Sequence, residues 1–240
     1  MLLSVVIASR NEKYLQKTIL DLLSKAKEEI EIIVTLDGSW SEVCDDPRVS
    51  YIHFTKARGM RNALNSAVAV ARCKYILKTD AHCMFADGFD VVLKRDHRHK
   101  TILIPRRYAL DPEKWEIEKR TDNKFPIDVM ILNDTLQAIP TTIRKDNALI
   151  ETESFQGSCW FMTKRYYQKL GLLDEETYGS FYQEAQEIGF KCKKDGGKIL
   201  CDTNTWYAHW HKVEGRGYSL SEKPDKTREE IKKLYESMND

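Results

Sequence analysis

The chain lacks three features that mark common protein classes: an excess of one charge, a long apolar run and an internal repeat. Its 240 residues hold 38 Lys and Arg against 37 Asp and Glu, a net charge of +1. This balance excludes the global basicity of a protein that coats nucleic acid. A chain of this length fits one core, so we expect a single domain over residues 1–240.

Cysteine pairs and targeting signals are also missing. The N-terminal apolar stretch ends at Arg10, which makes it too short for a signal peptide or a membrane span. The six cysteines never form a C-x-x-C pair, so a zinc ribbon has no support and reduced thiols are expected. These absences predict a cytoplasmic protein with no membrane span.

The first half of the chain alternates between strand and helix patterns. Residues 2–8 and 30–36 are short runs rich in Val and Ile, typical of strands buried on both faces of a sheet. Between them, Leu15, Ile19 and Leu22 recur at the spacing of a helix with one apolar face. The pattern continues with predicted strands at 51–54, 75–78 and 101–105, and predicted helices at 61–71 and 88–97. This alternation predicts an α/β fold, a doubly wound mixed sheet with helices on both faces.

Residues 111–153 lose this periodicity and hold Trp115, Pro126 and Pro140. Connections of that length usually carry function, so we interpret the segment as a lid or an insertion beside the site. Regular structure then resumes. We expect a strand at 160–163, helices at 164–170 and 183–194, a strand pair at 198–201 and 206–209, and a C-terminal surface helix within 222–240.

The ends of the predicted strands carry polar residues, where doubly wound sheets bind their ligands. Ser9-Arg10-Asn11-Glu12 follows the first strand and Asp37-Gly38-Ser39 the second. Each run by itself is as typical of a turn or a helix cap as of a ligand site. Their placement at successive strand ends indicates one shared site.

A metal site is the sharpest prediction from these strand ends. Asp80 and His82 are two residues apart in an extended segment, so both side chains can point to the same side. His209 and His211 repeat this spacing on a late strand, and one of them can complete the site. A carboxylate with imidazoles suits a first-row divalent cation such as Mn²⁺. The alternatives are a helix cap at Asp80 and ordinary core histidines.

Two basic clusters bear on nucleic-acid binding. Residues 94–100 hold Lys94, Arg95, Arg98 and Lys100, and the pair Arg106-Arg107 follows. A solvated helix end explains the first cluster better than a binding patch. If DNA is bound, these two clusters are the predicted contacts.

The strand-end motifs resemble those of glycosyltransferase family two. The resemblance lies in Ser4-Val5-Val6-Ile7-Ala8-Ser9-Arg10-Asn11-Glu12, Thr35-Leu36-Asp37-Gly38-Ser39, Arg58-Gly59-Met60-Arg61-Asn62 and Lys78-Thr79-Asp80-Ala81-His82-Cys83. The Asp-x-His form followed by Cys is similar to the polypeptide N-acetylgalactosaminyltransferases. The resemblance implies a GT-A fold and transfer of a sugar from a nucleotide-sugar donor, with 111–153 on the acceptor side. It extends from the first strand to about His211, apart from that segment.

The resemblance also implies roles for single residues. Asp37 would recognise uracil, and Asp80, His82 and His209 would hold Mn²⁺ or Mg²⁺ at the diphosphate of a UDP-sugar, where charge develops on the leaving group. Gly157 would let backbone approach the donor sugar, and Trp160 would offer it a stacking face; a plain glycine before a core strand is the alternative. The full set expected at the donor is Ala8, Ser9, Arg10, Asn11, Asp37, Arg58, Gly59, Asn62, Thr79, Ala81, Gly157, Trp160, His211 and Lys212.

The acidic segment Gln183-Glu184-Ala185-Gln186-Glu187 corresponds to the family's acidic motif. Glu184 and Glu187 are three apart on a predicted helix, so both can face the site as catalytic residues; solvated glutamates are the alternative. Ala185 stands where inverting relatives carry the aspartate that serves as base. We therefore favour a retaining, front-face transfer, as the resemblance to the N-acetylgalactosaminyltransferases implies.

The acceptor stays open. A glycan, a protein hydroxyl and a hydroxymethylated base in DNA are all compatible with the sequence, and so is any oligomeric state. A non-catalytic nucleotide or nucleic-acid binder is the rival from another class. A sugar nucleotidyltransferase is disfavoured because Ala8-Ser9-Arg10-Asn11 lacks the glycine-rich phosphate loop expected after the first strand.

Overall fold

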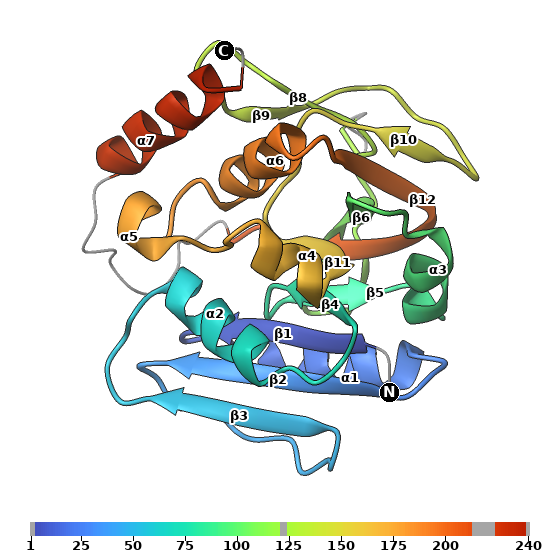
Figure 1. Ribbon diagram of the computed structural model, residues 1–240. Coiled ribbons are helices and arrows are strands. Elements are labelled where there is room, and N and C mark those ends of the chain that lie inside the picture. Colours follow the sequence, from blue (N-terminus) through green and yellow to red (C-terminus); the bar gives the residue numbers. More distant parts are fainter. Residues whose placement is uncertain (1–2, 121–123, 213–223, 239–240) are drawn as a thin grey trace.

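The computed structural model describes residues 3–120, 124–212 and 224–238 (Figure 1). Its strands are β1 (Leu3–Ser9), β2 (Ile30–Asp37), β3 (Val49–Phe54), β4 (Tyr75–Thr79), β5 (Cys83–Phe85), β6 (Thr101–Asp111), β7 (Glu116–Ile117), β8 (Met130–Leu132), β9 (Ala138–Pro140), β10 (Leu149–Glu151), β11 (Cys159–Thr163) and β12 (Lys198–His209). Its helices are α1 (Leu15–Lys25), α2 (Met60–Val70), α3 (Phe89–Asp96), α4 (Lys164–Lys169), α5 (Glu175–Tyr178), α6 (Glu184–Lys194) and α7 (Pro224–Glu236). None of these helices is long and apolar enough to cross a membrane.

One large mixed sheet runs through the molecule in the order β10-β12-β6-β11-β4-β1-β2-β3. Strands β4, β1, β2 and β3 are parallel, and β11 runs antiparallel between β4 and β6. β12 lies parallel to β6. The predicted doubly wound mixed sheet is therefore present, and the carboxyl ends of β1, β2, β4, β6 and β12 all meet at one edge.

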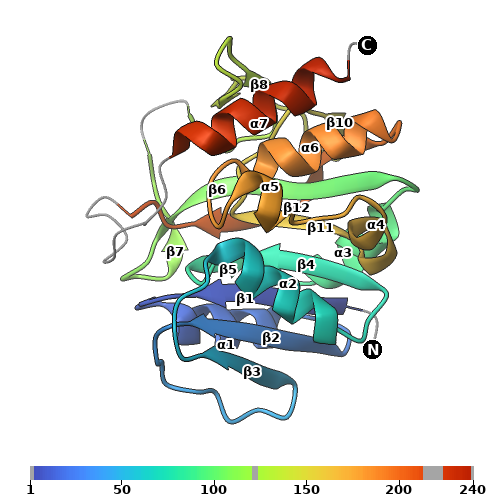
Figure 2. The same cartoon turned by 60° about the vertical axis from the view of Figure 1, so that its left-hand side comes forward.

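Helices cover both faces of the sheet because successive side chains of β1 point to opposite sides. Val5 and Ile7 pack in the same cluster as Leu15 of α1 and Phe89 of α3. Val6 packs in a second cluster with Leu64 of α2 and with residues of α4 and α6. Figure 2 shows α2 on one side of the strands and α1 on the other. The apolar runs read as two-faced strands are buried on both faces, as predicted.

The late strand pair was expected as two strands and is one. β12 continues from Lys198 to His209, with a register shift against β6 between Asp202 and Trp206. The polar residues Asp202, Thr203 and Asn204 break the apolar pattern, but a bulge keeps the backbone in the sheet. β6 is likewise longer than predicted and ends at Asp111 rather than at residue 105. The extra length carries Arg106 and Arg107 to the edge where the strand ends meet.

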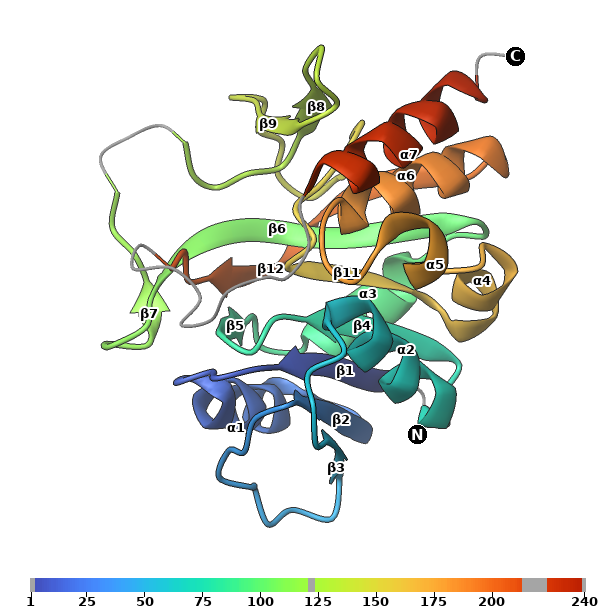
Figure 3. The same ribbon diagram turned by 90° about the vertical axis from the view of Figure 1, so that its left-hand side faces the viewer.

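The segment 111–153 is more regular than expected. It contains β7, the hairpin β8–β9 and β10, which adds a strand to the sheet edge beside β12. In Figure 3 the hairpin lies apart from the sheet, near α6 and α7. The predicted surface helix is α7; its inner face packs on α5 and α6 with Ile231 buried. Residues 222, 223, 239 and 240 of the predicted segment lie outside the described residues.

Candidate metal centre and its two flanking cavities

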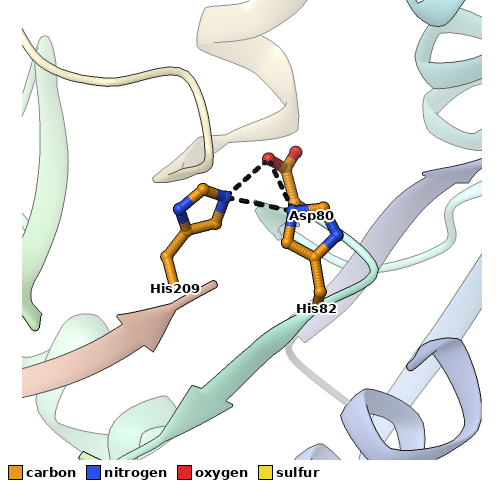
Figure 4. A group of neighbouring side chains, drawn as sticks. All are labelled: Asp80, His82 and His209. Atoms are coloured by element: carbon orange, nitrogen blue, oxygen red, sulfur yellow. Dashed lines mark hydrogen bonds and ion pairs between the residues drawn. The ribbon is translucent and has the colours of Figure 1, made fainter. Parts of the chain in front are cut away.

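Asp80, His82 and His209 converge as the sequence predicts (Figure 4). Asp80 and His82 follow β4 and His209 ends β12, and the candidate ligand atoms lie within 4.8 Å of one another. His209 Nε2 is 3.2 Å from both Asp80 Oδ2 and His82 Nε2, and His82 Nε2 is 3.9 Å from Asp80 Oδ2. Among the residues that the structure describes, this is the one group of three that meets these criteria.

The donor set and spacing fit a divalent cation. Two ligands at neighbouring corners of an octahedral ion lie about 3 Å apart when each bond is about 2.1 Å, close to the observed separations. Two imidazole Nε2 atoms that face each other at 3.2 Å can both direct a lone pair at one cation when each ring carries its proton on Nδ1. One carboxylate and two imidazoles suit Mn²⁺ better than Ca²⁺.

Neighbouring charges orient two of the three side chains. Glu12 accepts a hydrogen bond from His82 Nδ1 at 3.0 Å, which leaves His82 Nε2 for the ion, and Lys212 pairs with Glu12 at 2.5 Å. Lys78 donates to Asp80 Oδ1 at 2.7 Å, which leaves Oδ2 for the ion. Such partners raise metal affinity by fixing the ligand geometry. Glu12 and Lys78 were not among the predicted site residues, although a lysine inside an apolar strand was a signal for the second.

The protonation states suit metal binding near neutral pH. Burial alone raises the pKa of Asp80, but Lys78, His209 and His82 together hold it well below its ordinary value. Burial lowers the pKa of His209 to about 3, against the opposing effect of Asp80. Asp80 is therefore ionised and His209 neutral, the forms that bind a cation.

A cavity of about 310 Å³ lies on the β1–β2 side of the metal centre. Eight of the residues expected at the donor line it: Ala8, Ser9, Arg10, Asp37, Gly59, Ala81, His211 and Lys212. Asp37 accepts hydrogen bonds from the backbone N–H groups of Arg58 and Gly59, at 2.6 and 3.0 Å. We name this space the nucleotide-side cavity.

A second cavity of about 750 Å³ lies on the other side of Asp80. Segment 111–153 forms one wall of it, the loop at 155–158 the floor, and the first turn of α6 another wall. We name it the far cavity. Asp80 and His211 line both cavities, so the metal centre stands between them.

Glu184 lines the far cavity and is tied to its surroundings. Its Oε1 accepts from Trp160 Nε1 at 2.7 Å, and its Oε2 lies 3.5 Å from Lys78 Nζ. A Cβ on Gly157 would approach Glu184 Oε2 to 2.9 Å, so a glycine there leaves room for this carboxylate. Trp160 is 0% exposed, which corrects the stacking prediction: its ring is core, and its role at the site is the hydrogen bond to Glu184.

Glu187 does not face either cavity, contrary to the prediction that it is catalytic. It is completely buried and pairs with the equally buried Arg61, and its other oxygen accepts from the backbone N–H of Asp174 at 2.9 Å. Spacing of three places both glutamates on the inner half of α6, but only the first turn reaches the cavity. Glu187 holds α6 against α2 and the loop before α5.

Four further residues expected at the donor do not line the nucleotide-side cavity: Asn11, Arg58, Asn62 and Thr79. Asn62 donates to Glu175 at 2.9 and 3.1 Å. Thr79 is buried, and the Arg58 guanidinium lies 4.7 Å from the Phe54 ring. Of Arg58, the structure brings only the backbone N–H to the site, through Asp37.

The two basic clusters do not form one groove with the site. Residues 94–100 precede β6, whose carboxyl end is the one at the metal centre, so they lie at the opposite edge of the sheet. Lys94 pairs with Glu28 and Arg95 with Asp96. Arg106 is buried in an ion pair with Asp128. Of the residues in these two clusters, Arg107 alone lines the far cavity, and DNA contact by the clusters stays a prediction.

Comparison with known proteins agrees with this geometry. Solved structures with the same fold include GalNAc-T7 with UDP, GalNAc and Mn²⁺ (TM-score 0.79, 16% identity), over 100% of this chain and 50% of that one. S. aureus TarS 1-349 with UDP-GlcNAc follows at TM-score 0.64 and 13% identity, over 98% and 65%. A mannosyltransferase from Pyrobaculum calidifontis with GDP-Man and Mn²⁺ has TM-score 0.58 and 13% identity, over 90% and 58%.

The chain thus spans half to two thirds of the length of these solved chains, and it has their GT-A fold. No curated protein sequence matches it. The profile of glycosyl transferase family 2 matches residues 4–171, more than half of the sequence. The chain belongs to glycosyl transferase family 2.

Proposed function

We propose that the protein transfers a sugar from a UDP-sugar to an acceptor hydroxyl with the help of Mn²⁺ or Mg²⁺. The observation that carries this proposal is the cluster Asp80, His82 and His209 between two cavities. Similar folds hold UDP with Mn²⁺, UDP-GlcNAc, or GDP-Man with Mn²⁺. A non-catalytic binder would not need a second, larger cavity beyond the metal centre.

Different residues have the proposed roles at the nucleotide-side cavity and at the metal centre. Asp37 would accept the ring N–H of uracil through an oxygen lone pair that is not used by the backbone N–H groups of Arg58 and Gly59. Asp80, His82 and His209 would hold the cation, which when bound offsets the negative charge of the diphosphate. Lys212, at 15% side-chain exposure, lies on the nucleotide side and adds a positive contact there.

We propose that the far cavity holds the sugar and the acceptor, with segment 111–153 as the acceptor-side wall. Among its described lining residues the carboxylates are Asp80 and Glu184. Asp80 is assigned to the cation, and Glu184 is held by Trp160 and Lys78. Ala185 lines the same cavity and offers no base. This supports a retaining transfer in which the departing phosphate oxygen takes the acceptor proton and Glu184 orients the acceptor.

The test has two parts. The first is release of UDP from a panel of UDP-hexoses and UDP-N-acetylhexosamines, alone and with pools of glycans, peptides and DNA that contains hydroxymethylated pyrimidines. This also decides which sugar and which acceptor are used. The second is the anomeric configuration of the product by NMR: an α-linked product from an α-linked donor supports retention, and a β-linked product rejects it and makes Glu184 the candidate base.

The reducing cytoplasm is the proposed compartment. The six cysteines are unpaired thiols, and five of them are buried. Intact activity after long incubation with a thiol reductant would agree with this proposal, whereas inactivation would oppose it.

A further inference from the structure

Strand β6 carries two consecutive arginines that differ in whether a carboxylate compensates their charge. Arg106 has every expected partner: its Nε and Nη2 each lie 2.7 Å from a different oxygen of Asp128, and its Nη1 lies 2.7 Å from Asp146. A bidentate pair of this kind compensates a buried guanidinium. Arg106 thereby holds the segment after β6 against the sheet, which is a structural role.

Arg107 points to the other face of the same strand and has no such compensation. It is 5% exposed, and within residues 3–120, 124–212 and 224–238 no carboxylate pairs with it. Its Nη2 donates to His211 Nε2, while its buried Nε has no hydrogen-bond partner among those residues. A buried cation without an anion costs free energy. Packing alone therefore does not explain an arginine at this position.

The location of Arg107 indicates where an anion would bind. It lines the far cavity and not the nucleotide-side cavity. The centroid of the Phe125 ring is 5.5 Å from Arg107 Cζ and 5.4 Å from Arg120 Cζ. Lys124 lines the same wall. This wall of the cavity is therefore cationic around an aromatic ring.

The rest of the far cavity does not offset this wall. Its acidic lining residues are Asp80 and Glu184, and Lys78 lies between them at 2.7 and 3.5 Å. Lys78 and, under the proposed function, the cation thus compensate most of the negative charge of Asp80 and Glu184. Arg120 on this wall pairs with Glu118 at 3.3 Å, so the guanidinium without a carboxylate partner among the described residues is that of Arg107.

We propose that Arg107 determines acceptor specificity by binding a phosphate group of the acceptor, within the far cavity. The inference rests on the proposed function, since it names the class of acceptor for the same site. A guanidinium binds phosphate oxygens through its N–H groups, and among the described residues no carboxylate competes for those of Arg107, which lines the far cavity. A polyol phosphate, a sugar phosphate and a nucleic-acid backbone all present this phosphate ester, and the two phosphate probes below distinguish these sources.

The experiment uses the full chain with Mn²⁺ and UDP, and it first measures the Kd of UDP. Two phosphate probes are then titrated by calorimetry, glycerol 3-phosphate and single-stranded oligothymidylate, with glycerol as the uncharged counterpart. The proposal expects at least one phosphate probe to bind about tenfold more tightly than glycerol. Arg107→Met should lose about tenfold in affinity for that probe, because the phosphate loses its hydrogen bonds to a charged group, while the Kd of UDP stays within about twofold.

Arg98→Met is the matched control, because Arg98 is exposed at the opposite edge of the sheet, and it should leave both Kd values unchanged. The thermal midpoint of the ligand-free protein is a second readout: Arg107→Met should equal or exceed the wild type, since methionine removes an unpaired buried charge. Equal phosphate binding by Arg107→Met and wild type, an equal loss for UDP, or a lower midpoint overturns the proposal. Failure of the wild type to bind UDP at all refutes the proposed function instead.

Discussion

The two cavities beside Asp80 are built in different ways. The nucleotide-side cavity is formed largely by residues that directly follow β1, β2, β4 and β12 or begin α2. The far cavity combines the end of β6, segment 111–153, the loop before β11 and the first turn of α6. The first is thus a property of parallel strand ends, which doubly wound sheets share. The second depends on how connections of this particular chain pack, so it is where specificity for an acceptor can differ between relatives.

Loss of a metal ligand is expected to have the largest effect, because both cavities share the centre. His82→Ala, or removal of divalent ions with EDTA, should lower turnover of the donor by about 10³-fold, since the ion contributes several kcal/mol of charge stabilisation. Mn²⁺ should restore activity to the chelated wild type. His99→Ala, an exposed histidine at the opposite edge, is the control. Full activity of His82→Ala would show that the reaction does not depend on a metal held by His82.

Glu187→Gln tests whether Glu187, unlike Glu184, has a structural role outside the far cavity. The substitution leaves Arg61 buried without its charge partner and should lower the free energy of unfolding by about 3–5 kcal/mol, measured in urea. Glu151→Gln breaks an ion pair exposed to 60% on both sides and should cost less than about 1 kcal/mol. Wild-type stability together with lost turnover would instead make Glu187 catalytic.

Glu12→Ala tests the orientation of a metal ligand from the nucleotide side. Without Glu12, His82 Nδ1 loses its acceptor, and the affinity for Mn²⁺ should fall by roughly 10–100-fold, measured by titrating the metal-free protein. Glu42→Ala, an exposed glutamate in the loop after β2, should bind Mn²⁺ as the wild type does. An unchanged Mn²⁺ affinity in Glu12→Ala would show that Glu12 does not contribute to metal binding.

Asp37→Ala is expected to have the smallest effect, confined to the nucleotide-side cavity. The wild type should bind UDP more tightly than CDP, because cytosine lacks the ring N–H donor that uracil offers. The variant should lose about tenfold of this preference, the contribution of roughly one hydrogen bond to a charged group. Ser41→Ala, further along the same loop, is the control. An unchanged ratio of the UDP and CDP dissociation constants in Asp37→Ala would show that uracil is recognised elsewhere.

Local sequence motifs were sufficient to predict the metal ligands, because these lie in regular strands or directly after them. Asp80 and His82 could be paired from their spacing alone, and His209 joined them because β12 ends at the same sheet edge as β4. The sequence could not separate Arg106, a structural residue, from Arg107, which lines a cavity, since that depends on Asp128 and Asp146 lying over only one face of β6. Glu184 and Glu187 were indistinguishable for the same reason: Arg61 comes from a distant helix.

The sequence by itself determined the α/β alternation, the polar strand ends and the three candidate metal ligands, because periodicity and residue type act over a few neighbouring residues. Tertiary structure decided the rest. It buried Trp160 against Glu184, placed Glu12 on His82 and Lys78 on Asp80, and formed the far cavity from segments more than 100 residues apart in places, such as Arg107 and His211. Burial and charge pairing depend on which distant surfaces meet, and no local pattern encodes that meeting.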